Sequence, residues 1–188
     1  MYGDTAVLPK REDLPPRPLS PYAAAKLTGE MYCRSWAAHT WLETVSLRFF
    51  NVYGPRQDPG SPYAAVIPKF IRRLREGRPM PVHGDCGQTR DFTFVGDVVK
   101  GILLAGAAPA ASGRVYNLAG GRPVSVAELA RTLASLAGVR PEMELLPPRA
   151  GDIRDSWADA AAARRDLGFG AGTALAAGLR RTLEGFDA

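Results

Sequence analysis

Tyr22 and Lys26 are the residues whose types and spacing most directly predict chemistry. They stand four positions apart in residues 20–26, where Ser20 is a good helix N-cap, Pro21 suits a first helical turn and the following alanines favour helix. This spacing places both side chains on one helix face. An ammonium beside a phenol stabilises the phenolate and lowers its pKa from about 10. We therefore expect Tyr22 to exchange a proton with a substrate hydroxyl.

The same spacing also arises by accident on amphipathic helices, so the surrounding sequence decides its meaning. Residues 43–56 form a β-branched and aromatic run that predicts a buried strand ending at a Gly-Pro turn. Four further motifs follow: Tyr-Ala-Ala-Val-Ile-Pro-Lys at 63–69, Val-His-Gly-Asp at 82–85, Arg-Asp-Phe-Thr-Phe-Val at 90–95 and Pro-Arg-Ala-Gly-Asp at 148–152. Each is weak alone, but six in order form a specific pattern.

Together these motifs resemble the extended short-chain dehydrogenase/reductases, and within them the NAD-dependent epimerase/dehydratase family, most of all the UDP-hexose 4-epimerases. The resemblance implies an α/β fold: the C-terminal part of a Rossmann-type doubly wound parallel sheet plus a small mixed α/β substrate-binding lobe. Residues 1–60 would be the remnant of the NAD-binding domain. Residues 61–188 would be mainly the nucleotide-sugar lobe, with Rossmann elements interleaved around 90–120.

The resemblance also implies a reaction, a cofactor and partners. Tyr22 would take the proton from a sugar 4-hydroxyl while NAD accepts the hydride from the same carbon, and return of the hydride to the other face of the 4-keto sugar would invert that centre. Tyr22, Lys26 and Phe50 would contact NAD, with Lys26 on the nicotinamide ribose and Phe50 near the nicotinamide. The substrate would be a UDP-sugar, and the parent protein a homodimer.

Five substrate contacts are implied in the same way. Asn51 would hydrogen-bond the sugar diphosphate, Ala65 and Val66 would lie against the nucleotide, and Val82 and His83 would line the uracil pocket. Val66 and Val82 fit an ordinary core role equally well. His83 is also typical of a half-exposed loop histidine, so we expect its position, not its imidazole, to matter.

Two arginines and two neighbouring polar residues complete the expected site. Arg90 and Arg149 have guanidinium groups that match pyrophosphate oxygens, although a surface role is the common one in an arginine-rich chain. Asp152 would orient Arg149 or bind the ribose. Ser156 matches a position where a bulky tyrosine in 4-epimerases excludes N-acetyl groups, so a serine there predicts tolerance of an N-acetyl group.

One family motif is missing from the sequence. No Gly-x-Gly-x-x-Gly follows a predicted strand, and the glycines of residues 168–172 instead suit the end of a helix. The family also carries a catalytic Ser or Thr just before a Val-Tyr-Gly-Asp segment, to which residues 1–4 correspond. We therefore expect an N-terminal truncation relative to the family, with the main NAD site upstream and apolar surface left uncovered.

Composition excludes other classes. The chain of 188 residues is 46% hydrophobic and 23% charged, as in soluble globular proteins. Cys33 and Cys86 lack disulfide-scaffold or metal-site spacing, which predicts free thiols, no metal and a cytoplasmic location. The apolar run at 101–111 is too short to span a bilayer, which excludes the membrane. The net charge of +5 is dispersed, which argues against nucleic acid.

Periodicity predicts the remaining elements. A capping box at Ser125 and Glu128 begins a helix that runs to about Gly138. Short strands are expected at 115–118 and 143–146, helices around 67–76 and 98–108, and a terminal helix through 175–186.

Two functional hypotheses remain open. One is the C-terminal portion of an NAD-dependent nucleotide-sugar 4-epimerase, although a dehydratase, decarboxylase or uronate epimerase shares the Tyr-x-x-x-Lys motif. The other is a catalytically inactive remnant that binds a nucleotide sugar or pairs with another chain.

Overall fold

The structure is a computed structural model that describes residues 1–58, 65–148 and 153–186. The helices are α1 (Pro21–His39), α2 (Val66–Arg75), α3 (Val95–Gly106), the 3-10 turn η1 (Pro109–Ala111), α4 (Val126–Leu136), α5 (Ala161–Leu167) and α6 (Leu175–Glu184). The strands are β1 (Ser46–Phe49), β2 (Val52–Tyr53), β3 (Met80–His83), β4 (Thr89–Arg90), β5 (Thr93–Phe94), β6 (Val115–Leu118), β7 (Val124–Ser125), β8 (Met143–Leu146) and β9 (Asp155–Ser156). The predicted α/β class, with parallel strand pairs, is confirmed.

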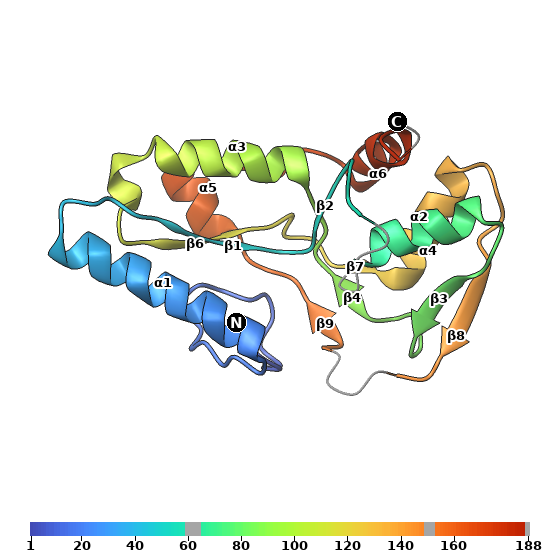
Figure 1. Cartoon of the computed structure of the whole chain (residues 1–188), viewed down its shortest axis with the longest axis horizontal. Coiled ribbons are helices and arrows are strands. Elements are labelled where there is room, and N and C mark those ends of the chain that lie inside the picture. Colours follow the sequence, from blue (N-terminus) through green and yellow to red (C-terminus); the bar gives the residue numbers. More distant parts are fainter. Residues whose placement is uncertain (59–64, 149–152, 187–188) are drawn as a thin grey trace.

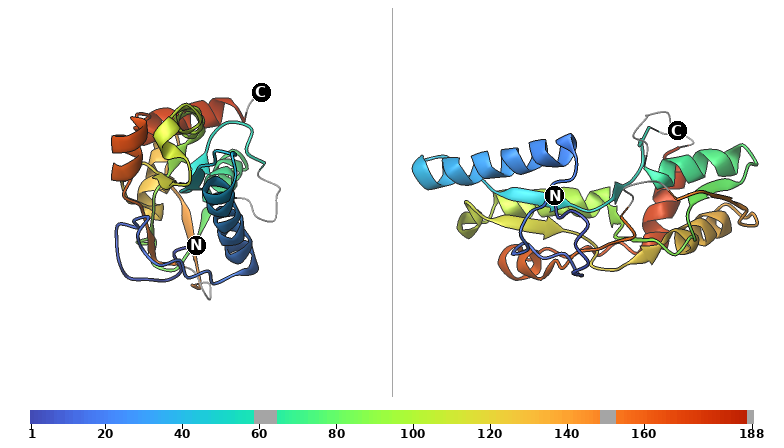
Figure 2. Two further views of the ribbon diagram at one scale, coloured as in Figure 1. Left: turned by 90° about the vertical axis from the view of Figure 1, so that its left-hand side faces the viewer. Right: turned by 90° about the horizontal axis from the view of Figure 1, so that it is seen from below.

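Strands β1 and β6 form a parallel pair in one half of the molecule (Figure 1), with Ser46 opposite Val115 and Phe49 opposite Leu118. Helices α1 and α5 lie on opposite sides of this pair in the right-hand view of Figure 2. The strand predicted at 115–118 is confirmed as β6. Its buried side chains pack with α3 and α5 in one apolar cluster. Helix α5 ends at Gly168, whose φ of 66° suits the glycine that the sequence places there.

The predicted strand over 43–56 is broken at Asn51. The residue has a φ of 28°, and asparagine is one of the few residues that tolerate this left-handed region. Before the break β1 pairs with β6, and after it β2 pairs with β5, while the Asn51 carbonyl accepts the Thr93 amide at 3.3 Å. The chain thus leaves one strand pair for another at Asn51.

The other half of the molecule carries helices α2, α4 and α6 around a second core. Strands β3 and β8 pair in parallel, and β4 lies between β7 and β9 in a three-stranded sheet. The predicted helix N-cap is confirmed, since Ser125 Oγ accepts the Glu128 amide at 3.0 Å, whereas the Glu128 carboxylate pairs with Arg122. Helix α3 begins at Val95, three residues before the predicted start. Buried apolar side chains of this core include Ile67, Phe70, Met80, Leu129, Leu133 and Leu179.

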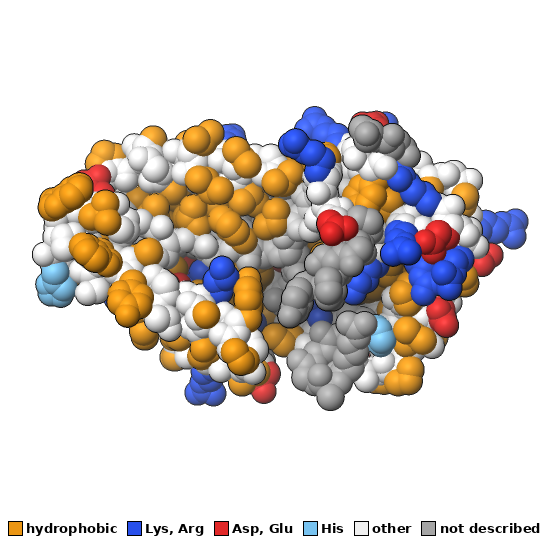
Figure 3. All heavy atoms as spheres, in the orientation of Figure 1, with side chains coloured by type: hydrophobic (Ala, Val, Ile, Leu, Met, Phe, Trp, Pro, Cys, Tyr) orange, Lys and Arg blue, Asp and Glu red, His pale blue; other side chains and the backbone are white. Residues whose placement is uncertain are grey.

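Uncovered apolar side chains gather over α1, β1 and α3, as the space-filling view shows (Figure 3). Trp41, just beyond α1, is 91% exposed. The large exposed hydrophobic residues in this part of the chain include Met31, Tyr32, Trp36, Phe49, Val99, Ile102 and Leu103. The expected uncovered apolar surface is therefore present. None of the described helices has the length and apolarity needed to cross a membrane.

Candidate functional site

The first two turns of α1 present Tyr22 and Lys26 to an open cavity. Ser20 caps the helix, because its Oγ accepts the Ala23 amide at 3.2 Å, and Pro21 occupies the first turn. The Lys26 Nζ lies 5.4 Å from the centroid of the Tyr22 ring, over its face. The predicted helix and the shared face are confirmed. Tyr22 is 73% exposed, so its hydroxyl is accessible to a ligand.

The cavity beside Tyr22 and Lys26 has a volume of about 550 Å³ and is called the larger cavity below. Its lining contains five of the predicted residues: Tyr22, Lys26, Phe50, Asn51 and Ser156. They come from α1, from the end of β1 and from β9, which are far apart in the sequence. The fold therefore brings the predicted catalytic, cofactor and sugar-gating residues to one place.

A smaller cavity of about 240 Å³ holds the other predicted residues that the structure describes. Asn51, Ala65, Val66, Val82, His83 and Arg90 all line it. Asn51 lines both cavities, so the break between β1 and β2 joins them. Arg149 and Asp152 lie outside the described residues.

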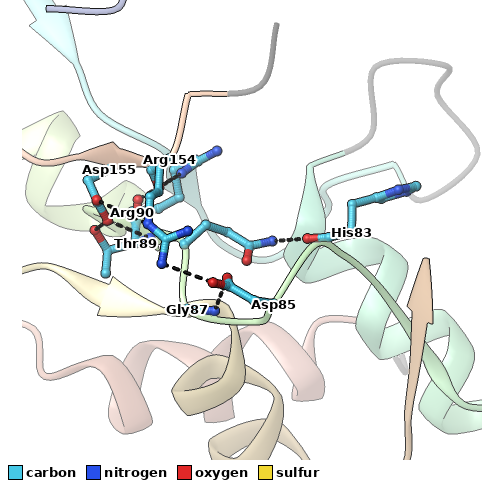
Figure 4. A network of polar contacts seen from close by, with 8 residues as sticks. His83, Asp85, Gly87, Thr89, Arg90, Arg154 and Asp155 are labelled. Atoms are coloured by element: carbon cyan, nitrogen blue, oxygen red, sulfur yellow. Dashed lines mark hydrogen bonds and ion pairs between the residues drawn. The ribbon is translucent and has the colours of Figure 1, made fainter. Parts of the chain in front are cut away.

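Arg90 is held against the backbone of β4 and of the segment just before β9 (Figure 4). Its Nη1 donates to the carbonyls of Thr89 at 2.8 Å and Arg154 at 2.9 Å. The parallel register of β4 and β9 sets Arg90 opposite Ser156. These contacts fix the Arg90 guanidinium group in the lining of the smaller cavity.

An ion pair ties the loop before β4 to the segment before β9. Arg154 Nη2 lies 2.9 Å from Asp85 Oδ2, and the Gly87 amide donates to Asp85 Oδ1 at 3.0 Å. The Gly87 amide, and then Arg154, lower the pKa of Asp85. Thr89 Oγ1 adds a 2.6 Å hydrogen bond to Asp155. The loop and β9 are thus held together beside Arg90.

His83 faces the smaller cavity with a defined tautomer. Its Nδ1 lies 2.9 Å from the Pro147 carbonyl oxygen, which can only accept, so Nδ1 carries the proton. The His83 carbonyl in turn accepts from Gln88 Nε2 at 2.6 Å. Hydrogen bonding thus fixes the position of this residue.

Sequence reasoning missed five residues with charged or amide side chains that line the cavities. Lys69 and Gln88 line the smaller cavity, and Lys10, Glu30 and Arg48 line the larger one. Two of them could have been found from the sequence. Lys69 belongs to the motif at 63–69, and Arg48 is a charged residue inside an apolar strand, which is typical of a functional or paired side chain. Lys10 is 1% exposed and donates to the Thr5 carbonyl, while burial lowers its pKa. Nothing in its local sequence indicates that burial.

The described residues contain no cluster of His, Cys, Asp or Glu suited to a metal ion. Cys33 and Cys86 are both free thiols, as predicted.

Comparisons with known proteins identify relatives of the chain. The chain is 40% identical to a UDP-glucose 4-epimerase of Mycolicibacterium smegmatis over 186 residues, which cover 99% of this chain and 59% of that protein. A UDP-N-acetylglucosamine 4-epimerase from Methanobrevibacter ruminantium, solved with UDP-N-acetylmuramic acid, superposes with a TM-score of 0.94 at 35% identity. A UDP-glucose 4-epimerase from Thermotoga maritima, solved with UDP-glucose, gives 0.93 at 37%.

In both structural comparisons 99% of this chain is covered, against 59% and 60% of the solved chains. The chain thus spans about three fifths of the length of these relatives. Its residues 1–119 match the sequence family described as the NAD dependent epimerase/dehydratase family. The chain belongs to that family.

Proposed function

We propose that the chain is the C-terminal portion of an NAD-dependent nucleotide-sugar 4-epimerase that acts on a UDP-sugar through a 4-keto-hexose intermediate. One observation carries the proposal. The Tyr22–Lys26 pair and the expected nucleotide contacts line two cavities that adjoin at Asn51. A substrate whose reacting sugar is linked to a nucleotide fits such a pair of cavities.

In this proposal the smaller cavity holds the UDP moiety. Val66 and Val82 give apolar contact to the base, and Ala65 and His83 lie beside it. Lys69 and Arg90 bring positive charge to the same cavity, which suits a diphosphate. Arg149 and Asp152 complete the proposed set from outside the described residues.

The larger cavity would receive the sugar and the nicotinamide end of NAD. The aromatic wall of Phe50 and the ammonium of Lys26, both at this cavity, fit a nicotinamide and its ribose. NAD supplies the hydride acceptor when bound. Tyr22 would take the proton from the sugar 4-hydroxyl and return it, while Asn51 holds the diphosphate side of the sugar.

The proposed domain division assigns residues 1–60, with elements around 90–120, to an NAD-binding domain, and most of 61–188 to the substrate lobe. The uncovered apolar residues over α1, β1 and α3 support it, because parallel sheets are normally covered on both faces. A homodimer through α1 is a further proposal, supported by the exposed Met31 and Trp36 on that helix.

The same exposed surface favours a second candidate function. A chain that binds a nucleotide sugar and pairs with a separate cofactor-binding polypeptide would also present apolar faces over α1 and α3. Its catalysis would depend on that partner. The two candidates share the UDP cavity and differ in the polypeptide that supplies the rest of the NAD site.

Two titrations test the proposal on this chain. Isothermal titration with UDP should show binding, and Arg90→Ala should weaken it, because the smaller cavity is built from this chain alone. Absence of UDP binding by the folded protein would refute both candidates. Titration of NAD into the polypeptide as the cell makes it then separates them. A 4-epimerase that carries its own NAD site should bind NAD alone, whereas a chain that relies on another polypeptide should gain NAD affinity only when that polypeptide is added.

A further inference from the structure

Helix α1 is attached to the rest of the chain by a polar contact. Of its 19 residues, all of which the structure describes, Glu30 alone is buried. A surface helix is normally held by an apolar stripe, whereas large apolar side chains of α1 such as Met31 and Trp36 are exposed in this chain. Glu30 stands one turn after Lys26 and two turns after Tyr22, which places the three on one face. The contact that holds Glu30 therefore helps to set the positions of Tyr22 and Lys26.

Arg48 on β1 holds Glu30 with two hydrogen bonds. Its Nε lies 2.9 Å from Glu30 Oε2 and its Nη2 lies 2.7 Å from Oε1. Both side chains are only 7% exposed. Burial opposes the charge of Arg48, but the hydrogen bonds and charge of Glu30 help to raise its pKa above the ordinary value. A two-armed contact of this kind fixes rotation as well as distance.

Arg48 is itself held from the other side. Its guanidinium carbon lies 4.7 Å from the centroid of the Tyr2 ring. The Tyr2 hydroxyl donates to Asn117 Oδ1 on β6 at 2.6 Å, and Asn117 is fully buried. The ion pair is therefore anchored to the β1–β6 pair. Arg48 is thus held both by Glu30 and, through Tyr2, by Asn117, so it can serve as a fixed point for α1.

The strand that carries Arg48 also leads to Phe50, a further lining residue of the larger cavity. Arg48 precedes Phe50 by two residues, so the two side chains share one side of the extended chain. Tyr22 and Lys26 form the wall contributed by α1. We infer that the Glu30–Arg48 ion pair is a positioning device, which fixes the height and rotation of α1 over β1 and so places the Tyr22 hydroxyl against the substrate.

This inference rests on the proposed acid/base role of Tyr22, and conservative variants test it. Glu30→Asp keeps the charge but shortens the contact by one methylene, and Arg48→Lys keeps the charge but loses the fork. Both variants are made in the polypeptide that the cell itself produces. We expect each to lower kcat for UDP-sugar interconversion about 10- to 100-fold. KM for the UDP-sugar and the Kd for UDP should not change, because neither Glu30 nor Arg48 lines the smaller cavity, which is proposed to hold the UDP moiety.

Arg122→Lys is the matched control. Its salt bridge with Glu128 is exposed, so kcat should stay at the parent value. The double variant Glu30→Gln/Arg48→Met serves if a single variant fails to fold, because it leaves no lone buried charge. It should show the same low kcat, with faster amide hydrogen exchange in the first two turns of α1.

Unchanged kcat in folded Glu30→Asp and Arg48→Lys proteins, or in the double variant, would overturn the positioning role. Tyr22→Phe, measured in parallel, separates this failure from that of the proposed function. If Tyr22→Phe is inactive while the ion-pair variants are fully active, only the positioning role is wrong. If Tyr22→Phe keeps the parental kcat, the acid/base assignment itself is wrong.

Discussion

The ring of Tyr53 packs directly against Gly178 of α6. A Cβ at Gly178 would lie 2.9 Å from Tyr53 Cζ and 3.0 Å from Phe94 Cδ2, and both rings are buried. Because neither ring can move into open space, Gly178→Ala should lower the free energy of unfolding by about 1–3 kcal/mol. Denaturant melting of the two proteins measures the difference.

Gly106→Ala is the control for this substitution. Gly106 is the last residue of α3, and a Cβ there would meet no atom within 4 Å. Replacing an exposed helical glycine by alanine should stabilise the protein by up to about 1 kcal/mol. Equal destabilisation by Gly106→Ala and Gly178→Ala would show that close packing at Tyr53 is not the cause.

Tyr53 also predicts how stability depends on alkaline pH. Burial, and then the charge of Asp97, raise the pKa of its phenol to about 12. A folded pKa above the unfolded value of about 10 means that the stabilisation is complete below pH 10 and lost as pH rises towards 12. The free energy of unfolding should fall more steeply over this range in the parent than in Tyr53→Phe. Parallel slopes in pH-dependent urea melts would contradict this.

Arg90→Lys tests whether the smaller cavity recognises a diphosphate by its arginine. Lysine keeps the charge but cannot make two parallel hydrogen bonds, so the affinity for UDP should fall by about tenfold or more. The affinity for uridine, which has no phosphate, should change little. An equal loss for uridine and UDP in calorimetric titrations would assign Arg90 a purely structural role.

Ser156→Tyr tests the proposed tolerance of an N-acetyl group. Ser156 lines the larger cavity on β9, and a tyrosine there would fill part of it. Turnover of UDP-GlcNAc should therefore drop much more than turnover of UDP-glucose. Loss of both activities to the same extent would count against a gating role.

The sequence predicted most elements because each has a local cause. Ser20 and Ser125 cap their helices as expected, Gly168 ends α5, and the strands at 115–118 and 143–146 have the expected bounds. The helix bounds differ by a few residues, as at Val95. Local propensity and apolar periodicity were sufficient for these features.

What the sequence did not predict depends on contacts between distant segments. The run at 43–56 reads as one strand, and only its pairing with β6 and then with β5 explains the break at Asn51. Glu30 looks like any polar residue on a helix until Arg48 is found beside it, 18 positions along the chain. Lys10 forms a backbone bridge with Ala158, nearly 150 positions away. Periodicity carries no information on such pairings.

One measurement tests the central claim most directly: turnover of a UDP-sugar deuterated at carbon 4, with NAD present, by the polypeptide as its own cells produce it and by its Tyr22→Phe variant. Proton NMR should show the epimer forming with deuterium retained at carbon 4, and Tyr22→Phe should slow it by roughly 10²–10⁴-fold. No epimer from the parent, or an equal rate from Tyr22→Phe, would contradict the account.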